Sequence, residues 1–147
     1  QKDTAGANWY YVRITCGKKK YFGYCKAQTG SGRCQEAADA LKSRGIDARL
    51  IEMPCIKPLD KTMVLSAARE TGAILTVEDR NVNGGMGSYV CQTVCAHSPA
   101  LVACMGLPDT FAQSGLEDEL YEYCHLGTAD IVAAAEALWR QKGGSNA

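Results

Sequence analysis

A glycine-rich segment that follows two acidic residues is the stretch best suited to hold a small ligand. The candidate positions are Glu78, Asp79, Gly84, Gly85, Gly87 and Ser88. Glycines let backbone N–H groups approach an anion at a helix N-terminus. The acids oppose this use, because like charges a few ångströms apart repel by about 1–4 kcal/mol. The spacing also departs from G-x-G-x-x-G, so a tight strand-to-helix crossover is the favoured interpretation.

A second candidate site combines two cysteines and a histidine. Cys91 and Cys95 share one face of an expected helix, and His97 follows closely,. No fourth metal ligand is evident, and paired C-x-x-C motifs are absent,. A Cys–His nucleophile would also need a third group and an oxyanion hole, which the sequence does not identify. We therefore expect the cysteines to pack as apolar residues, we assign no catalytic residue or metal ligand, and we place His125 on the surface.

The segment 18–26 alternates basic and aromatic residues, a pattern that could grip single-stranded nucleic acid by charge and stacking,. The formal net charge of the chain is zero. A neutral protein has little general attraction for a phosphate backbone. We therefore expect these lysines to be solvated and predict no nucleic-acid partner.

The eight cysteines raise the question of disulfides. A chain of 147 residues that is 46% hydrophobic can build a core without them, and several cysteines lie in apolar segments,. We favour free thiols and a cytoplasmic protein, and any disulfides would involve mainly Cys16, Cys25 and Cys34. No apolar run approaches the roughly 20 residues that span a bilayer, so no membrane partner is expected.

Short β-rich runs alternate with helical patterns, which predicts an α/β fold with a mostly parallel sheet. The predicted strands are 48–53, 73–78 and 101–105, the last being apolar enough for burial on both faces,. Asp60 is placed to cap a helix that Gly72 ends, and Thr128 to cap the last helix,. Other helices are expected at 36–42, after Gly85 with Met86, Val90 and Val94 on one face, and near 117–124,.

The N-terminal part is less regular. Residues 10–15 predict a strand, Gly17 a turn, and residues 21–25 a second strand that would complete a hairpin,. Residues 28–32 are expected to form a loop. We divide the chain into an N-terminal part (1–35) of the same domain, an α/β domain (36–140) and a disordered tail (141–147).

Several short motifs occur together in a fixed order. They are Ile56-Lys57-Pro58-Leu59-Asp60, Thr76-Val77-Glu78-Asp79, Gly84-Gly85-Met86-Gly87-Ser88, Pro108-Asp109-Thr110-Phe111 and Thr128-Ala129-Asp130-Ile131-Val132. Each alone is a weak signal. As an ordered set covering about 36–139, they resemble the C-terminal domain of the transketolase family of thiamine-diphosphate-dependent enzymes. Against the family pattern, residues 18–32 would be an insertion, which leaves the place of the first strand open.

The resemblance implies a three-layer α/β/α domain around a mixed five-stranded sheet. It also implies a parent enzyme that transfers a two-carbon ketol unit between sugar phosphates with thiamine diphosphate and Mg²⁺. The family's Gly-Asp-Gly motif is absent from this sequence. We therefore expect no cofactor on this chain alone and a structural role, with the cofactor-binding and pyrimidine-binding regions of a transketolase as partners in a homodimer. The chain would be cut from those regions or encoded apart from them.

The alternative is a module of another class. A stand-alone ligand-binding or regulatory protein that kept the fold would bind a small molecule at the carboxyl ends of its strands, beside Glu78, Asp79, Gly84 and Gly85.

Overall fold

The computed structural model describes residues 21–25, 30–53, 55–111 and 113–143. Strands and helices alternate along the chain, as predicted. The strands are β1 (Tyr21–Cys25), β2 (Ala48–Glu52), β3 (Ala73–Asn81) and β4 (Leu101–Leu107). The helices are α1 (Gly30–Ser43), α2 (Lys61–Thr71), α3 (Met86–His97), α4 (Glu117–Tyr123) and α5 (Thr128–Gln141). This alternation confirms the α/β class.

The described strands form one parallel sheet in the order β2-β1-β3-β4. The hairpin predicted for β1 is wrong, because β1 lies between β2 and β3 and runs parallel to both. That prediction relied on residues 10–15 being close to β1 in sequence, whereas both of its partners, β2 and β3, come later in the chain. The strand predicted at 10–15, and with it the fifth strand of a mixed sheet, lies outside the described residues and stays a prediction.

The segment 18–32 is not an insertion throughout. It contains β1, and α1 already begins at Gly30, within the predicted loop. The chain therefore passes from its first described strand into its first helix within a few residues, which is the order that the family pattern calls for.

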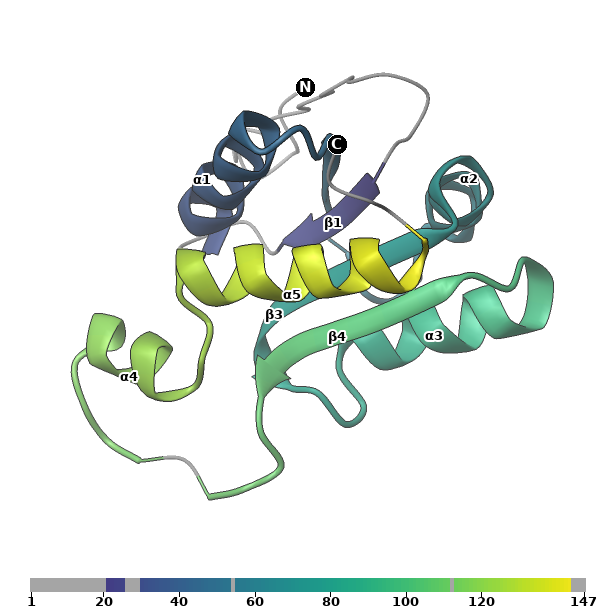
Figure 1. Cartoon of the computed structure of the whole chain (residues 1–147). Coiled ribbons are helices and arrows are strands. Elements are labelled where there is room, and N and C mark those ends of the chain that lie inside the picture. Colours follow the sequence, from purple (N-terminus) through teal and green to yellow (C-terminus); the bar gives the residue numbers. More distant parts are fainter. Residues whose placement is uncertain (1–20, 26–29, 54, 112, 144–147) are drawn as a thin grey trace, which may run out of the picture.

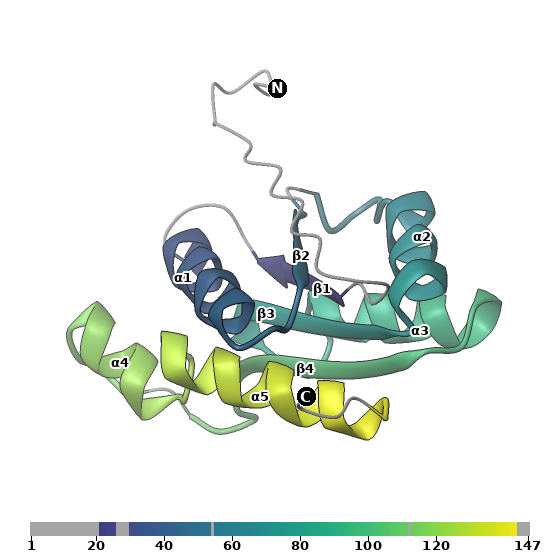
Figure 2. The same ribbon diagram turned by 45° about the horizontal axis from the view of Figure 1, so that its top comes forward.

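Two pairs of helices cover the two faces of the sheet (Figures 1 and 2). α1 and α5 lie on one face, where Leu41, Leu75 and Trp139 belong to one buried cluster. α2 and α3 lie on the other face, over a cluster that includes Val64, Ile74 and Val90. Among the described helices, none is long and apolar enough to cross a membrane.

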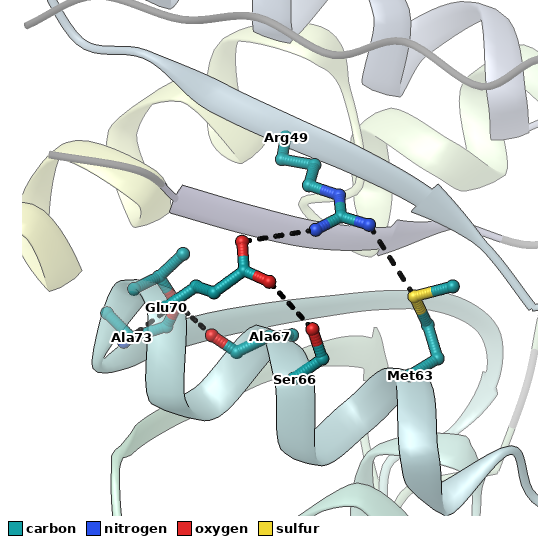
Figure 3. Close-up of polar contacts among 7 residues, drawn as sticks. Arg49, Met63, Ser66, Ala67, Glu70 and Ala73 are labelled. Carbon is teal, nitrogen blue, oxygen red and sulfur yellow. Dashed lines mark hydrogen bonds and ion pairs between the residues drawn. The ribbon is translucent and has the colours of Figure 1, made fainter.

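The predicted ends of α2 are confirmed. The Asp60 carboxylate accepts a hydrogen bond from the Met63 N–H at 2.9 Å, and Gly72 ends the helix with φ of 67°. Arg49 reaches from β2 to this helix (Figure 3), with its guanidinium 3.4 Å from the Glu70 carboxylate. Ser66 donates to the other oxygen of Glu70 at 2.7 Å. Polar contacts thus supplement the apolar packing of α2 on the sheet.

β4 differs from its prediction. A strand buried on both faces was expected, but β4 has only β3 as a neighbour among the described strands, and its residues are partly exposed. Leu101, at its start, is 39% exposed. An apolar run alone does not distinguish a central strand from an edge strand, because helices can shield either.

Candidate functional site

The Glu78 carboxylate lies at the N-terminus of α3. Glu78 comes near the carboxyl end of β3 and is only 4% exposed. One carboxylate oxygen accepts a hydrogen bond from the Met86 N–H at 2.6 Å, and the other accepts one from the Gly87 N–H at 2.8 Å. Negative charge is favoured at a helix N-terminus, where the first N–H groups have no partner within the helix. Here the protein's own carboxylate takes that place.

Two glycines allow this close approach. A Cβ atom on Gly85 would collide with the Glu78 carboxylate and would lie 2.6 Å from the backbone oxygen of Asn81. A Cβ atom on Gly87 would lie 2.6 Å from Cys104 Sγ and 2.7 Å from Thr76 Oγ1. Packing within the protein therefore accounts for both glycines without a ligand.

The rest of the loop is tied to itself. Gly84, with φ of 79°, donates its N–H to Ser88 Oγ at 2.9 Å, and this hydroxyl donates to the Val82 carbonyl at 3.0 Å. The Asn81 side chain accepts from the Asn83 N–H at 2.7 Å. The structure thus brings Glu78, the glycines and Ser88 together, while Asp79 is exposed. An anion at this helix N-terminus would have to displace Glu78.

Exposed apolar side chains also follow the carboxyl end of β4. We define the flap as residues 108–111 and 113–123, which contain the segment after β4 together with α4 (Figure 1). Three of its side chains are apolar and highly exposed: Phe111 at 102%, Leu116 at 71% and Tyr123 at 61%. Asn81 holds the start of the flap by donating to the Asp109 carboxylate at 2.9 Å. The sequence motif 108–111 marks this region, but sequence reasoning did not foresee its exposure.

The candidate cysteine–histidine group is spread apart. Cys95 and His97 are exposed, so the expected apolar packing is wrong for Cys95, which lies on the solvent side of α3. Cys91 is partly buried, and its sulfur lies 3.7 Å from that of Cys104 in β4. Burial and the neighbouring Cys104 raise the pKa of the Cys91 thiol to about 11. Within the described residues, no group of three potential ligands is arranged to hold a metal ion. Cys34 is buried, and His125 is exposed after α4.

The described residues do not fit thiamine diphosphate. An apolar cavity between α1, α5 and the sheet measures about 50 Å³, whereas ligand pockets measure about 300–1,000 Å³,. Its lining includes Leu41, Leu75 and Leu138, which offer nothing to a diphosphate. The helix N-terminus that could hold a phosphate carries Glu78 instead. The described residues therefore give no basis for a reaction step that uses thiamine diphosphate.

A second buried carboxylate, Asp47, precedes β2. It is 1% exposed, and neither of its oxygens has a hydrogen-bond partner in the part of the chain that the structure describes. Burial raises the pKa of Asp47, and the charge of Lys42 opposes this only in part. The folded protein therefore binds this proton more tightly than the unfolded chain does. The stability from Asp47 is fully present below its unfolded pKa and falls as the pH rises through its folded pKa.

We expect Asp47→Asn to stabilise the protein at neutral pH, by about 1 kcal/mol, because the amide cannot ionise. Thermal unfolding between pH 4 and pH 8 would show the difference growing with pH. A difference of the same size at every pH would contradict this account, because it would then come from the packing of the amide.

The parallel sheet, with Glu78 bound at the N-terminus of α3, defines an α/β domain. Comparison with known proteins identifies its class. The family model "Transketolase, C-terminal domain" matches residues 29–131, so the chain belongs to this family. The chain is 38% identical, over 110 residues, to 1-deoxy-D-xylulose-5-phosphate synthase 1 of Geobacter sulfurreducens, covering 74% of this chain and 17% of that protein. It is 35% identical, over 106 residues, to the 6-deoxy-6-sulfo-D-fructose transketolase subunit SqwH of a Clostridium species, covering 72% and 33%.

A solved structure shows the same fold. The structure described as "Split gene transketolase, inactive beta4 tetramer" matches with a TM-score of 0.75 and 32% identity. The match covers 86% of this chain and 42% of that one. The chain thus spans about a sixth to a third of the curated relatives above and less than half of the split-gene chain.

Proposed function

We propose that the chain is the C-terminal domain of a transketolase-type enzyme, or of the smaller subunit of one whose catalytic regions are encoded separately. Its role would be structural: it packs against the pyrimidine-binding region and supports the dimer. The observation that carries this proposal is the match to a split-gene transketolase over 86% of the chain at 32% identity. SqwH is likewise named as a transketolase subunit.

The parent reaction in this proposal is the transfer of a two-carbon ketol unit between sugar phosphates in the cytoplasm. Thiamine diphosphate and Mg²⁺ would be bound by the partner regions. The relatives' names cover both transketolases and a synthase of a sugar phosphate, so similarity alone does not select the substrate. The filled helix N-terminus at Glu78 and the small apolar cavity support a domain that binds no cofactor itself.

The flap is the surface that best fits a contact with the rest of the enzyme. Exposed apolar surface on a soluble protein can mark an interaction site. Phe111, Leu116 and Tyr123 all lie within the flap. Acidic residues of α4, among them Asp118 and Glu122, adjoin them. The proposal therefore places an apolar partner surface with some positive charge against the flap.

The test is a ketol-transfer assay on the purified chain with thiamine diphosphate and Mg²⁺, alone and with the companion region of the enzyme. We expect no turnover alone and turnover with the companion. Phe111→Ser should weaken the complementation at least tenfold without changing the melting temperature, because this side chain is fully exposed,. Arg69→Ser, at an exposed position on α2, is the matched control and should complement normally.

Activity of the chain alone would overturn the proposal. Failure of every companion, together with stabilisation of the isolated chain by a small molecule in a thermal-shift screen, would instead support the stand-alone module. In that case the ligand is expected beside Asp79, Gly84 and Ser88, and Glu78 would have to release the helix N-terminus.

A further inference from the structure

We propose that Cys91 and Cys104 are the site of a reversible disulfide that joins α3 to β4. Their sulfur atoms lie 3.7 Å apart, and the two residues are separated by 13 positions in the chain. Both side chains are partly exposed and both thiols are free. Because a disulfide bond measures about 2.0 Å, the sulfurs need to approach by only about 1.7 Å.

The packing around Cys104 directs its sulfur toward α3. The sulfur lies next to Gly87, where a Cβ atom would collide with it, and Cys91 follows one turn later on the same helix. Cys91 and Gly87 are four residues apart and therefore lie on one face of the helix. The pairing is thus set by two rigid elements that lie side by side, and it needs no rearrangement of a loop.

A turn of the sulfur disturbs no polar contact of its neighbour Thr76. Among the described residues, the Thr76 hydroxyl, which like Cys104 Sγ lies beside Gly87, is buried without a hydrogen-bond partner. A rotation about the Cα–Cβ bond of either cysteine therefore breaks no hydrogen bond of Thr76.

The oxidant in this proposal is a small disulfide, such as oxidised glutathione. One protein thiol loses its proton and attacks, the S–S bond of the oxidant breaks, and one glutathione leaves as a thiol. The second protein thiol loses its proton and attacks the mixed disulfide, which releases the second glutathione. Two protein thiols are thereby oxidised to one disulfide, and one glutathione disulfide is reduced to two thiols.

The pH dependence follows from the state of Cys91. Its pKa is raised to about 11, so only a small fraction is thiolate near neutral pH. Exchange proceeds through the thiolate. We therefore expect the rate of bond formation to rise with pH, by up to roughly tenfold per unit between pH 7 and pH 9, where Cys91 is the attacking thiol.

The experiment treats the reduced protein with oxidised glutathione, blocks the remaining thiols by alkylation and maps the disulfides by mass spectrometry after digestion. We expect a cross-linked pair of peptides containing Cys91 and Cys104. Cys95→Ser, which removes an exposed thiol one turn away, should leave the pair intact, whereas Cys91→Ser and Cys104→Ser should each abolish it. The oxidised form should melt about 5–10 °C higher than the reduced form.

The wild-type map alone can overturn the proposal, so the test does not depend on the folding of any variant. Separate alkylation of Cys91 and Cys104 while other cysteines pair would do so. A link from Cys91 to Cys95, or stable glutathione adducts that never resolve, would do so equally. None of these outcomes depends on a companion subunit, and the result is therefore distinct from that of the complementation assay.

Discussion

Replacing Glu78 with alanine should lower the free energy of unfolding by about 3–5 kcal/mol. The change removes a buried carboxylate that accepts from both the Met86 and Gly87 N–H groups, and it leaves these donors without a partner. Hydrogen bonds to a charged group contribute about 1.5–3 kcal/mol each, and an unsatisfied buried donor costs about 1–3 kcal/mol. The N-terminus of α3 also loses the charge that its dipole favours.

Urea unfolding followed by circular dichroism measures this loss. Glu78→Gln keeps one acceptor but no charge and should fall between the wild type and Glu78→Ala. Glu122→Ala removes an exposed carboxylate of α4 and should change the stability by less than about 0.5 kcal/mol,. A loss below about 1 kcal/mol for Glu78→Ala would show that water or another group replaces the carboxylate at the helix.

Gly85→Ala should cost about 2–4 kcal/mol. The new methyl group would meet the Glu78 carboxylate and the backbone oxygen of Asn81, and the backbone cannot yield as a flexible side chain can. Overpacking of this kind costs about 1–3 kcal/mol, and displacement of the carboxylate weakens its two hydrogen bonds as well. The same unfolding measurement applies.

Gly32→Ala is the matched control for this glycine. Gly32 lies in the first turns of α1, is exposed, and has no atom within 4 Å of the added Cβ. Alanine there should stabilise the protein by about 0.5–1 kcal/mol. The double variant of Glu78→Ala and Gly85→Ala should lose less than the sum of the single losses, because part of the clash is with Glu78 itself. Strict additivity would contradict the proposed contact.

Local signals were sufficient for the ends of α2 and for most of the strands, but not for every helix. α1 begins at Gly30, six residues before its predicted start, and the predicted cap Thr128 is wrong, because Gly127 occupies the cap position of α5. α2 begins after Asp60 and ends before Gly72, as expected, because side-chain caps and left-handed glycines act over three or four residues. The order of the strands was not predictable in this way. β1 was assigned to a hairpin because of its neighbour in sequence, yet its partners are reached only after α1 and α2. Pairing over such distances depends on how whole helices pack, which no local pattern encodes.

The sequence drew attention to the loop between β3 and α3 but did not predict how its residues are arranged. The sequence pointed to Glu78 and the glycines, and it treated the acid as an obstacle to an anion. In the structure this acid is itself the anion at the helix, which the spacing of eight residues between Glu78 and Met86 could have suggested. The approach of Cys91 to Cys104 gave no such signal, since it depends on the register between a helix and the strand beneath it.

The position of β1 has a consequence for the order of events during synthesis. β1 leaves the ribosome before β2 and β3, yet it must lie between them. β2 lies on one side of β1, and the pair β3–β4 lies on the other. In the described sheet, β2 and β3 are connected by hydrogen bonds only through β1 (Tyr21–Cys25). The earliest described strand therefore has no partner among the described strands until the chain has been made beyond residue 52, and it lacks its second partner until the chain has passed residue 77. A nascent chain that is cleaved shortly after residue 25 would lose the strand that links both parts of its sheet.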